Sequence, residues 1–168
     1  MGRAVSLWAR ATGLIALALA SQLALAAPPV MDFELPMIDG SKFARLADFG
    51  AKPVLLNFWG SECPPCAREM PLLNAQAQAQ ANTGLTFIGI AVDERAAAER
   101  FLARLRPGYL QLIARQQPEV LMRRFGNRLG ALPYTVLLDA KHGICAARVG
   151  EVDAAWLEAA IKACAAPA

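Results

Sequence analysis

The sequence predicts an α/β fold in which a central mixed β-sheet is covered by helices on both faces. Short apolar segments alternate with helix-like segments along most of the chain. One of them, residues 54–59, is apolar at nearly every position, which is typical of a strand buried on both faces of a parallel sheet. The last elements read as a hairpin and a helix, so part of the sheet is expected to be antiparallel.

The first half of the chain alternates between strand and helix patterns. Residues 33–40 predict a short strand that is interrupted at Pro36. The buried strand at 54–59 leads into a helix pattern over residues 64–81, which is rich in Ala, Leu and Gln. Two prolines open this helix, where their missing N–H groups cost nothing. A second apolar strand is predicted at residues 85–92.

The second half continues the alternation and then closes with the hairpin. Asp153 is predicted to cap the final helix. In chain order the expected elements are a helix at 94–106, a strand at 109–114, a short helix at 118–125, a loop at 126–131, paired strands at 134–138 and 144–149, and a helix to about residue 163.

The N-terminus is interpreted as a signal peptide over residues 1–26. Arg3 and Arg10 precede a short apolar run, and small residues end at Ala26. An uncleaved inner-membrane anchor facing the periplasm is the alternative, but the run is shorter than the roughly 20 residues that a spanning helix needs. We therefore expect one exported, periplasmic domain over residues 27–168. Without the two arginines the chain is close to neutral, so nothing indicates nucleic-acid binding.

Two cysteines, Cys63 and Cys66, lie at the predicted start of the first long helix. Unpaired N–H groups and the helix dipole favour a thiolate at Cys63, while Cys66 lies one turn further in and is shielded. Disulfide exchange needs such a pair, in which one thiol attacks and the other resolves the mixed disulfide. The alternatives are a structural disulfide or half of a zinc site, for which the chain offers no second ligand pair.

The region around these cysteines resembles the active-site segment of the TlpA/ResA/DsbE group, which are exported thiol–disulfide oxidoreductases of thioredoxin-like fold. The similarity covers about residues 31–162 and implies a thioredoxin-like fold with the N-terminal and central additions of that group. The residues that carry it are 57–60, Cys63-Pro64-Pro65-Cys66, Glu69, Pro71, 92–94 and 132–139.

The resemblance also implies which residues form the site. Glu69 corresponds to the glutamate that the group holds near the dithiol, and such a carboxylate could relay a proton from Cys66. A surface glutamate is the alternative. Leu132–Pro133 is implied to be a cis peptide beside the cysteines, with an ordinary trans proline as the alternative. The residues expected to contact substrate are Trp59, Glu62, Pro64, Pro65, Leu132 and Pro133.

One position departs from the group, because Glu62 stands where a Trp is usual. A negative charge beside Cys63 opposes formation of the thiolate, so we expect it to raise the pKa of Cys63 relative to a Trp neighbour.

The other two cysteines, Cys145 and Cys164, fall in the hairpin and near the end of the last helix. A bond between them would tie that helix to the sheet, and we expect a structural disulfide. A second redox pair and free thiols are the alternatives.

The function expected from the resemblance is reduction of disulfides in exported client proteins, for cytochrome c maturation or copper-site assembly. A membrane thiol relay of the DsbD/CcdA type is the implied electron donor, the protein is expected to be a monomer, and no cofactor or metal is expected. A thiol oxidase or isomerase is the alternative within this class.

A copper chaperone would use Cys63 and Cys66 as soft ligands. Related copper-binding proteins also use a distant His, but His142 is interpreted as a solvated loop residue. A peroxidase is disfavoured, since Leu56 and Gly60 occupy the positions of its activating Pro and Thr.

Overall fold

A computed structural model describes residues 31–165 of the chain. The predicted signal peptide and the first residues of the predicted domain lie outside this range. Within the described residues, no helix is both long and apolar enough to cross a membrane.

The central sheet has five strands in the order β5-β4-β3-β6-β7. Strand β3 is parallel to β4 and antiparallel to β6, so the sheet is mixed, as the sequence predicted. Strand β4 is parallel to β5, and β6 forms the antiparallel hairpin with β7. The strands are β3 (Val54–Trp59), β4 (Thr86–Ala91), β5 (Leu110–Ile113), β6 (Tyr134–Leu138) and β7 (Ile144–Val149).

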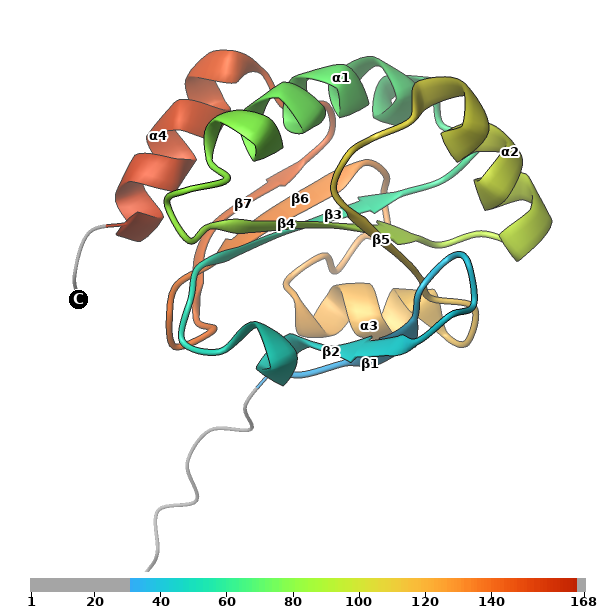
Figure 1. The fold of residues 1–168 in the computed structure, drawn as a ribbon, viewed down its shortest axis with the longest axis horizontal. Helices are drawn as coiled ribbons and strands as arrows, with labels where there is room; N and C mark the ends of the chain where they lie inside the picture. The colour runs from blue at the N-terminus through green and yellow to red at the C-terminus, as the bar shows by residue number, and fades with distance from the viewer. Residues whose placement is uncertain (1–30, 166–168) are drawn as a thin grey trace, which may run out of the picture.

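Helices cover both faces of the sheet, as Figure 1 shows. Helices α1, α2 and α4 lie on one face, and α3 lies on the other together with a small hairpin of β1 and β2. Side chains of β3 alternate between these layers, with Phe58 packing on the α3 side and Trp59 on the α1 side. The helices are α1 (Pro64–Ala79), α2 (Arg95–Leu105), α3 (Pro118–Arg124) and α4 (Ala154–Ala165).

The N-terminal hairpin was only partly predicted. The strand expected at residues 33–40 is shorter, β1 (Glu34–Pro36), and it pairs with β2 (Phe43–Arg45), which was not expected. A 3-10 helix, η1 (Leu46–Phe49), follows and was also missed. Three-residue strands are too short to show a period-2 pattern, and their pairing partner decides whether they form.

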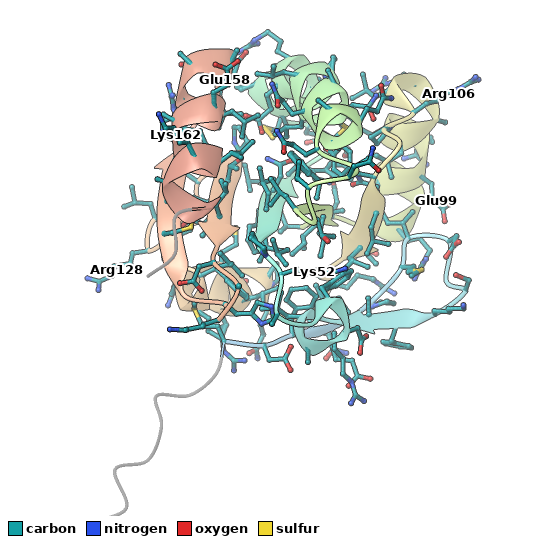
Figure 2. All side chains as sticks on the ribbon, turned by 60° about the vertical axis from the view of Figure 1, so that its left-hand side comes forward. Lys52, Glu99, Arg106, Arg128, Glu158 and Lys162 are labelled. Carbon is teal, nitrogen blue, oxygen red and sulfur yellow. A yellow bond between two sulfur atoms is a disulfide. The ribbon has the colours of Figure 1, made fainter. Side chains whose placement is uncertain are left out.

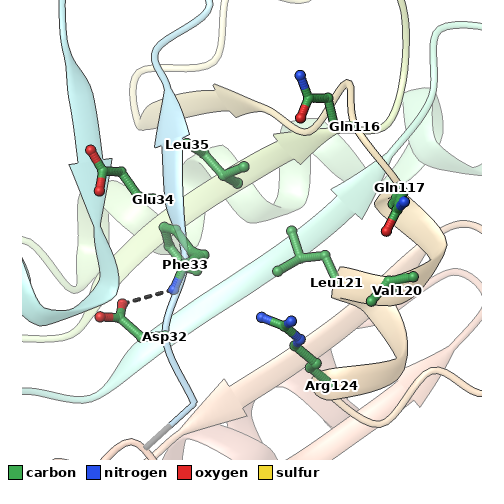
Figure 3. Close-up of a pocket in the computed structure, with 9 residues that line it drawn as sticks. All are labelled: Asp32, Phe33, Glu34, Leu35, Gln116, Gln117, Val120, Leu121 and Arg124. Atoms are coloured by element: carbon green, nitrogen blue, oxygen red, sulfur yellow. Dashed lines mark hydrogen bonds between the residues drawn. The ribbon is translucent and has the colours of Figure 1, made fainter.

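A hollow of about 210 Å³ lies between β1 and α3, on the opposite face of the sheet from α1 (Figure 3). Phe33 and Leu121 line it from the two sides, and Arg124 extends from α3. Asp32 holds the entry to β1, because its Oδ1 accepts hydrogen bonds from the Phe33 N–H at 2.7 Å and the Leu46 N–H at 3.0 Å. None of the lining residues is a cysteine.

Charged side chains lie at the outer edges of the helical layer, as Figure 2 shows for Glu99 and Arg106 at α2 and for Glu158 and Lys162 on α4. The interior between sheet and helices is apolar with few exceptions. Among the described residues, Glu69 is the only charged side chain that is fully buried. That exception lies on α1, the helix that begins at the cysteine pair.

Candidate active site

Cys63 and Cys66 form a disulfide at the start of α1. Cys63 is the N-cap residue, and its Sγ accepts a hydrogen bond from the Cys66 N–H at 3.2 Å. Their Cα atoms are 5.3 Å apart. Cys63 is partly exposed, whereas Cys66 is completely buried. Of the two cysteines, Cys63 is therefore the one that another molecule can approach from solvent.

The loop that leads into Cys63 is held by a carboxylate from the neighbouring strand. Asp93, just after β4, accepts a hydrogen bond from the Ser61 N–H through Oδ2 at 2.6 Å, and from the Glu94 N–H through Oδ1 at 3.2 Å. Partial burial opposes the charge of Asp93, but these hydrogen bonds outweigh it and hold its pKa below the ordinary value. Asp93 therefore fixes the turn two residues before Cys63.

The Leu132–Pro133 peptide is cis, as the resemblance implied. Leu132 lies against the same loop, because a Cβ atom added at Gly60 would be 3.3 Å from its Cδ1. Leu132 also packs with the apolar cluster that includes Cys63 and Cys66. The Pro133 carbonyl accepts a hydrogen bond from the Gly150 N–H at 2.8 Å, which ties this loop to the end of β7. The cis peptide thus lies beside the cysteines, at the position expected for substrate contact.

Trp59 has a different role from the one predicted. Its side chain has no exposed surface. The indole stacks on Phe101 of α2 with ring centroids 4.9 Å apart, and its Nε1–H donates to Gln111 Oε1 at 3.0 Å. The expected contact with a client is therefore replaced by a packing role, because Trp59 supports α1 and α2 from beneath.

The other residues expected to contact substrate differ in exposure. Glu62 and Pro64 are exposed on either side of Cys63, Pro65 and Leu132 are partly exposed, and Pro133 is buried. Their contact with a client stays a prediction.

Glu69 is buried beneath α1, so the alternative of a surface glutamate is wrong. It lies three residues after Cys66, and the buried side of α1 consists of Cys66, Glu69, Met70 and Leu73, which follow helical spacing. Its Oε1 accepts a hydrogen bond from Asn57 Nδ2 at 2.7 Å, and its Oε2 accepts one from the Val152 N–H at 2.9 Å. The carboxyl group therefore faces the sheet and the start of α4.

Burial raises the pKa of Glu69 from 4.5 to about 7. Hydrogen bonds from the Val152 N–H and from Asn57 oppose this rise, and so does the positive charge of Arg148, while Glu151 adds to it. A carboxyl group with this pKa takes up and releases protons near neutral pH. Glu69 is thus suited to general acid and base chemistry.

The register of the sheet places a polar row directly beneath α1. Thr135 pairs with Asn57, Asn57 with Gly89, and Gly89 with Gln111, so their side chains share one face. At Gly89 a Cβ atom would overlap the Gln111 carboxamide, which explains the glycine in this strand. Arg148 of β7 continues the row at its other end, beside Thr135.

Comparison with known proteins places this site in a family. A model of the AhpC/TSA family matches residues 26–154, most of the chain. The chain belongs to the AhpC/TSA family.

Within the AhpC/TSA family the chain is similar to proteins named ResA and DsbE. ResA, a thiol-disulfide oxidoreductase of Geobacillus thermodenitrificans, is 35% identical over 109 residues, which cover 64% of this chain and 60% of ResA. The thiol:disulfide interchange protein DsbE of Pseudomonas fluorescens biotype C is 36% identical over 128 residues, covering 74% of this chain and 67% of DsbE. The match thus spans about three fifths of the length of that ResA.

The fold agrees with this assignment. The crystal structure of a thiol:disulfide interchange protein of the thioredoxin family from Chlorobium tepidum TLS superposes with a TM-score of 0.69. The two chains are 27% identical, and the match covers 83% of this chain and 97% of that one. Both the thioredoxin-like fold and the resemblance to the ResA and DsbE group are thereby confirmed.

This AhpC/TSA family member carries a second disulfide, between Cys145 of β7 and Cys164 of α4. Their Cα atoms are 5.5 Å apart, so the bond ties α4 to the sheet as expected. Cys145 is exposed, whereas Cys164 is buried. The alternative of free thiols is wrong for this structure.

His142 is less solvated than expected. It occupies the turn between β6 and β7 with φ of 61°, and its imidazole is partly buried. Its Nε2 is buried without a hydrogen-bond partner among residues 31–165. No cluster of three or more potential metal-ligating side chains occurs in the described part of the chain.

No role was predicted from the sequence for three side chains around the site, although each lies in a segment that carries the resemblance. Asn57 donates to Glu69 and to Thr135, and Asp93 holds the cysteine loop. The signal for Asn57 and Thr135 was a lone polar residue within a strand predicted to be buried. No local pattern shows that Asp93 reaches Ser61, since the two are 32 residues apart.

Proposed function

We propose that this protein is a thiol–disulfide oxidoreductase of the ResA/DsbE type that reduces disulfides in exported client proteins. The observation that carries the proposal is the Cys63–Cys66 disulfide at the N-terminus of α1, in which Cys63 is partly exposed and Cys66 is buried. The names of the relatives supply the reaction class.

The first step is attack of the reduced protein on a client disulfide. The Cys63 thiolate forms a bond to one client sulfur, and the client's own S–S bond breaks to release its second sulfur as a thiolate. The N–H groups of the first turn of α1 stabilise the negative charge on Cys63 before attack. The backbone beside the cis Leu132–Pro133 peptide would pair with the extended client segment.

The second step resolves the mixed disulfide. Cys66 loses its proton, attacks the sulfur of Cys63 and releases the client as a thiolate, which takes a proton from solvent. Glu69 is the group suited to accept the Cys66 proton, because it lies one helical turn away and has a pKa of about 7. The result is a client with two thiols and an oxidised Cys63–Cys66 pair.

The cycle then needs two electrons from outside. We propose a membrane thiol relay of the DsbD/CcdA type as donor, and clients that serve cytochrome c maturation or copper-site assembly. The proposal includes a location outside the cytoplasm, delivered by the segment 1–26, and action as a monomer. Support comes from the ResA and DsbE relatives and from the signal-like N-terminus.

The two cysteine roles can be tested by trapping. A synthetic peptide with an intramolecular disulfide is incubated with reduced Cys66→Ser and Cys63→Ser variants, and the products are weighed by mass spectrometry. We expect Cys66→Ser to accumulate a mixed disulfide through Cys63 and Cys63→Ser to accumulate little, because its remaining thiol is buried. Equal trapping by both variants would remove the assignment of roles.

A further inference from the structure

The side-chain amide of Asn57 is buried beneath α1. Its NH₂ group makes hydrogen bonds, whereas its oxygen makes none within the described residues. Asn57, Glu69 and Thr135 are each at most 1% exposed. Asn57 Nδ2 donates to Glu69 Oε1 at 2.7 Å and to Thr135 Oγ1 at 3.0 Å. Asn57 Oδ1 is buried and has no hydrogen-bond partner among residues 31–165. Buried polar atoms are nearly always paired, so an empty carbonyl next to a titrating group requires an explanation.

One of the two hydrogen bonds to Glu69, that from Asn57 Nδ2 to Oε1, fits the ionised form and not a form protonated on Oε1. The carbonyl oxygen of a protonated carboxyl group is a better acceptor than its hydroxyl oxygen, so the Val152 N–H, which donates to Oε2 at 2.9 Å, favours protonation on Oε1. A proton taken up by Glu69 would therefore sit on Oε1 and point at the NH₂ group of Asn57. Two donors would then face each other across 2.7 Å.

Rotation of the Asn57 carboxamide by half a turn removes this conflict. The carboxamide has nearly the same outline in both orientations, because its oxygen and nitrogen are similar in size. In the rotated form Oδ1 accepts hydrogen bonds from the protonated Glu69 and from the Thr135 hydroxyl, which can donate as well as accept. The two hydrogen bonds of Asn57 are thus kept in either state of Glu69, while the side of the carboxamide without a partner changes from Oδ1 to the NH₂ group.

We propose that the Asn57 carboxamide reverses its orientation each time Glu69 gains or loses a proton, with Thr135 changing from acceptor to donor. Asn57 and Thr135 are then positioning residues that let a buried glutamate hold or release a proton without losing a hydrogen bond. The inference deepens the redox function proposed above and rests on it for the source of the proton, which is Cys66.

The surroundings of Glu69 are compatible with both states. Arg148 of β7 favours the charged form and Glu151, before α4, favours the neutral one. These two are already paired elsewhere, Arg148 with Asp153 at 3.0 Å and Glu151 with Arg68 at 2.7 Å. Tyr109 is a further titratable neighbour of Glu69, and burial raises its pKa, so it stays neutral through the range in which Glu69 titrates.

The test follows the Asn57 side-chain amide by NMR in the oxidised wild-type protein, from pH 5 to pH 9. We expect the ¹⁵N and proton shifts of its NH₂ group to titrate with the midpoint shown by the ¹³C carboxyl signal of Glu69. At high pH the amide protons should show nuclear Overhauser contacts to Thr135, and these should vanish at low pH. Asn127 is the internal control, since Ala131 O and the Gly130 N–H fix both sides of its buried amide.

A Glu69→Gln variant separates rotation from a general response to pH. The Val152 N–H requires the Gln carbonyl at the Oε2 position, so the Gln NH₂ must face Asn57, and Asn57 must present its oxygen. We expect the variant to show the low-pH signals of Asn57 at every pH.

Contacts between the Asn57 amide protons and Thr135 that persist in Glu69→Gln, or across the wild-type titration, would overturn the proposal. So would an Asn57 signal that does not titrate together with Glu69. None of these measurements requires turnover, so they stand apart from the trapping experiment, whose failure would instead remove the redox function.

Discussion

Glu69 shows how one buried side chain can link the stability of the protein to its chemistry. Because its carboxyl group lies between α1 and the sheet, ionisation places a negative charge in a site that is shielded from water. Two hydrogen bonds reduce this cost without removing it, and the pKa stays at about 7.

A Glu69→Gln variant should lose part of the pH dependence of stability. The pKa of Glu69 is about 7 in the folded protein and 4.5 as the ordinary value, so the folded state holds the proton more tightly. Its stabilising contribution is complete below pH 4.5 and is lost as the pH rises through 7, by up to about 3 kcal/mol. We expect the difference in unfolding free energy between wild type and variant to change over this window, measured by urea denaturation at several pH values. A difference independent of pH would contradict the raised pKa.

Asp93 should matter for the loop before Cys63 more than for the fold. Asp93→Ala removes the acceptor of the Ser61 N–H, at a cost of roughly 1–2 kcal/mol in unfolding free energy. The loop that presents Cys63 should become mobile, which hydrogen exchange at Ser61 would report as faster exchange. Asp93→Asn retains an oxygen acceptor and is the matched control, so it should exchange more slowly than Asp93→Ala. Equal protection of Ser61 in all three proteins would show that Asp93 does not hold the loop.

At the scale of elements, helix α4 is fastened at both ends. Near its start the Val152 N–H bonds to Glu69 of α1, and Asp153 Oδ1 accepts from the Trp156 N–H at 2.8 Å, the cap that the sequence predicted. Near its end the Cys145–Cys164 disulfide joins it to β7. The helix is therefore connected both to the edge of the sheet and to Glu69 of α1.

Removal of the second disulfide should destabilise the protein while leaving the site working. For a loop of about 20 residues the chain-entropy cost is roughly 3 kcal/mol, which a Cys145→Ala/Cys164→Ala variant should show in urea denaturation. We expect its Cys63–Cys66 pair to exchange with the disulfide peptide as the wild type does.

Graded reduction of the wild type supplies the companion measurement. At equilibrium Cys63–Cys66 should open first and Cys145–Cys164 at stronger reducing potential, because structural disulfides are generally harder to reduce. Mass spectrometry after alkylation measures how far each of the two disulfides has been reduced. Simultaneous opening of the two pairs would contradict a structural role for Cys145–Cys164.

For the whole molecule, we expect the reduction potential of the Cys63–Cys66 pair to depend on the negative charges near it. Glu62 is exposed beside Cys63, and Glu69 is buried one turn beyond Cys66. Negative charge disfavours the thiolate, and a destabilised thiolate makes the couple more reducing. We therefore expect a potential nearer that of thioredoxin, about −270 mV, than that of a dedicated oxidase.

Equilibration with glutathione or thioredoxin buffers measures this potential. Glu62→Gln should lower the pKa of Cys63 and make the couple less reducing, while Glu34→Gln, in the β1–β2 hairpin, is a control that should change neither. A strongly acidic Cys63, or a potential close to that of an oxidase, would favour the alternative of a thiol oxidase and leave the two active cysteines unchanged.

The sequence by itself determined the order of the main elements and the identity of the cysteine pair. Apolar runs, prolines at helix starts and the Asp153 cap are local signals, and the elements they predict agree with the structure to within a few residues. The spacing of Cys63 and Cys66 is equally local, because one helical turn brings the two sulfurs together.

Only the tertiary structure decided how that pair is supported. The contact between Asn57 and Thr135 spans 78 residues, and that between Glu69 and Val152 spans 83. Such contacts depend on strand order and register, which no local pattern specifies. The same reason applies to Trp59. An aromatic residue at this position is compatible with a surface or a core, and the packing of α1 and α2 decides that it is buried. The cysteine pair was therefore readable from neighbours in sequence, whereas the contacts that surround Glu69 depend on neighbours in space.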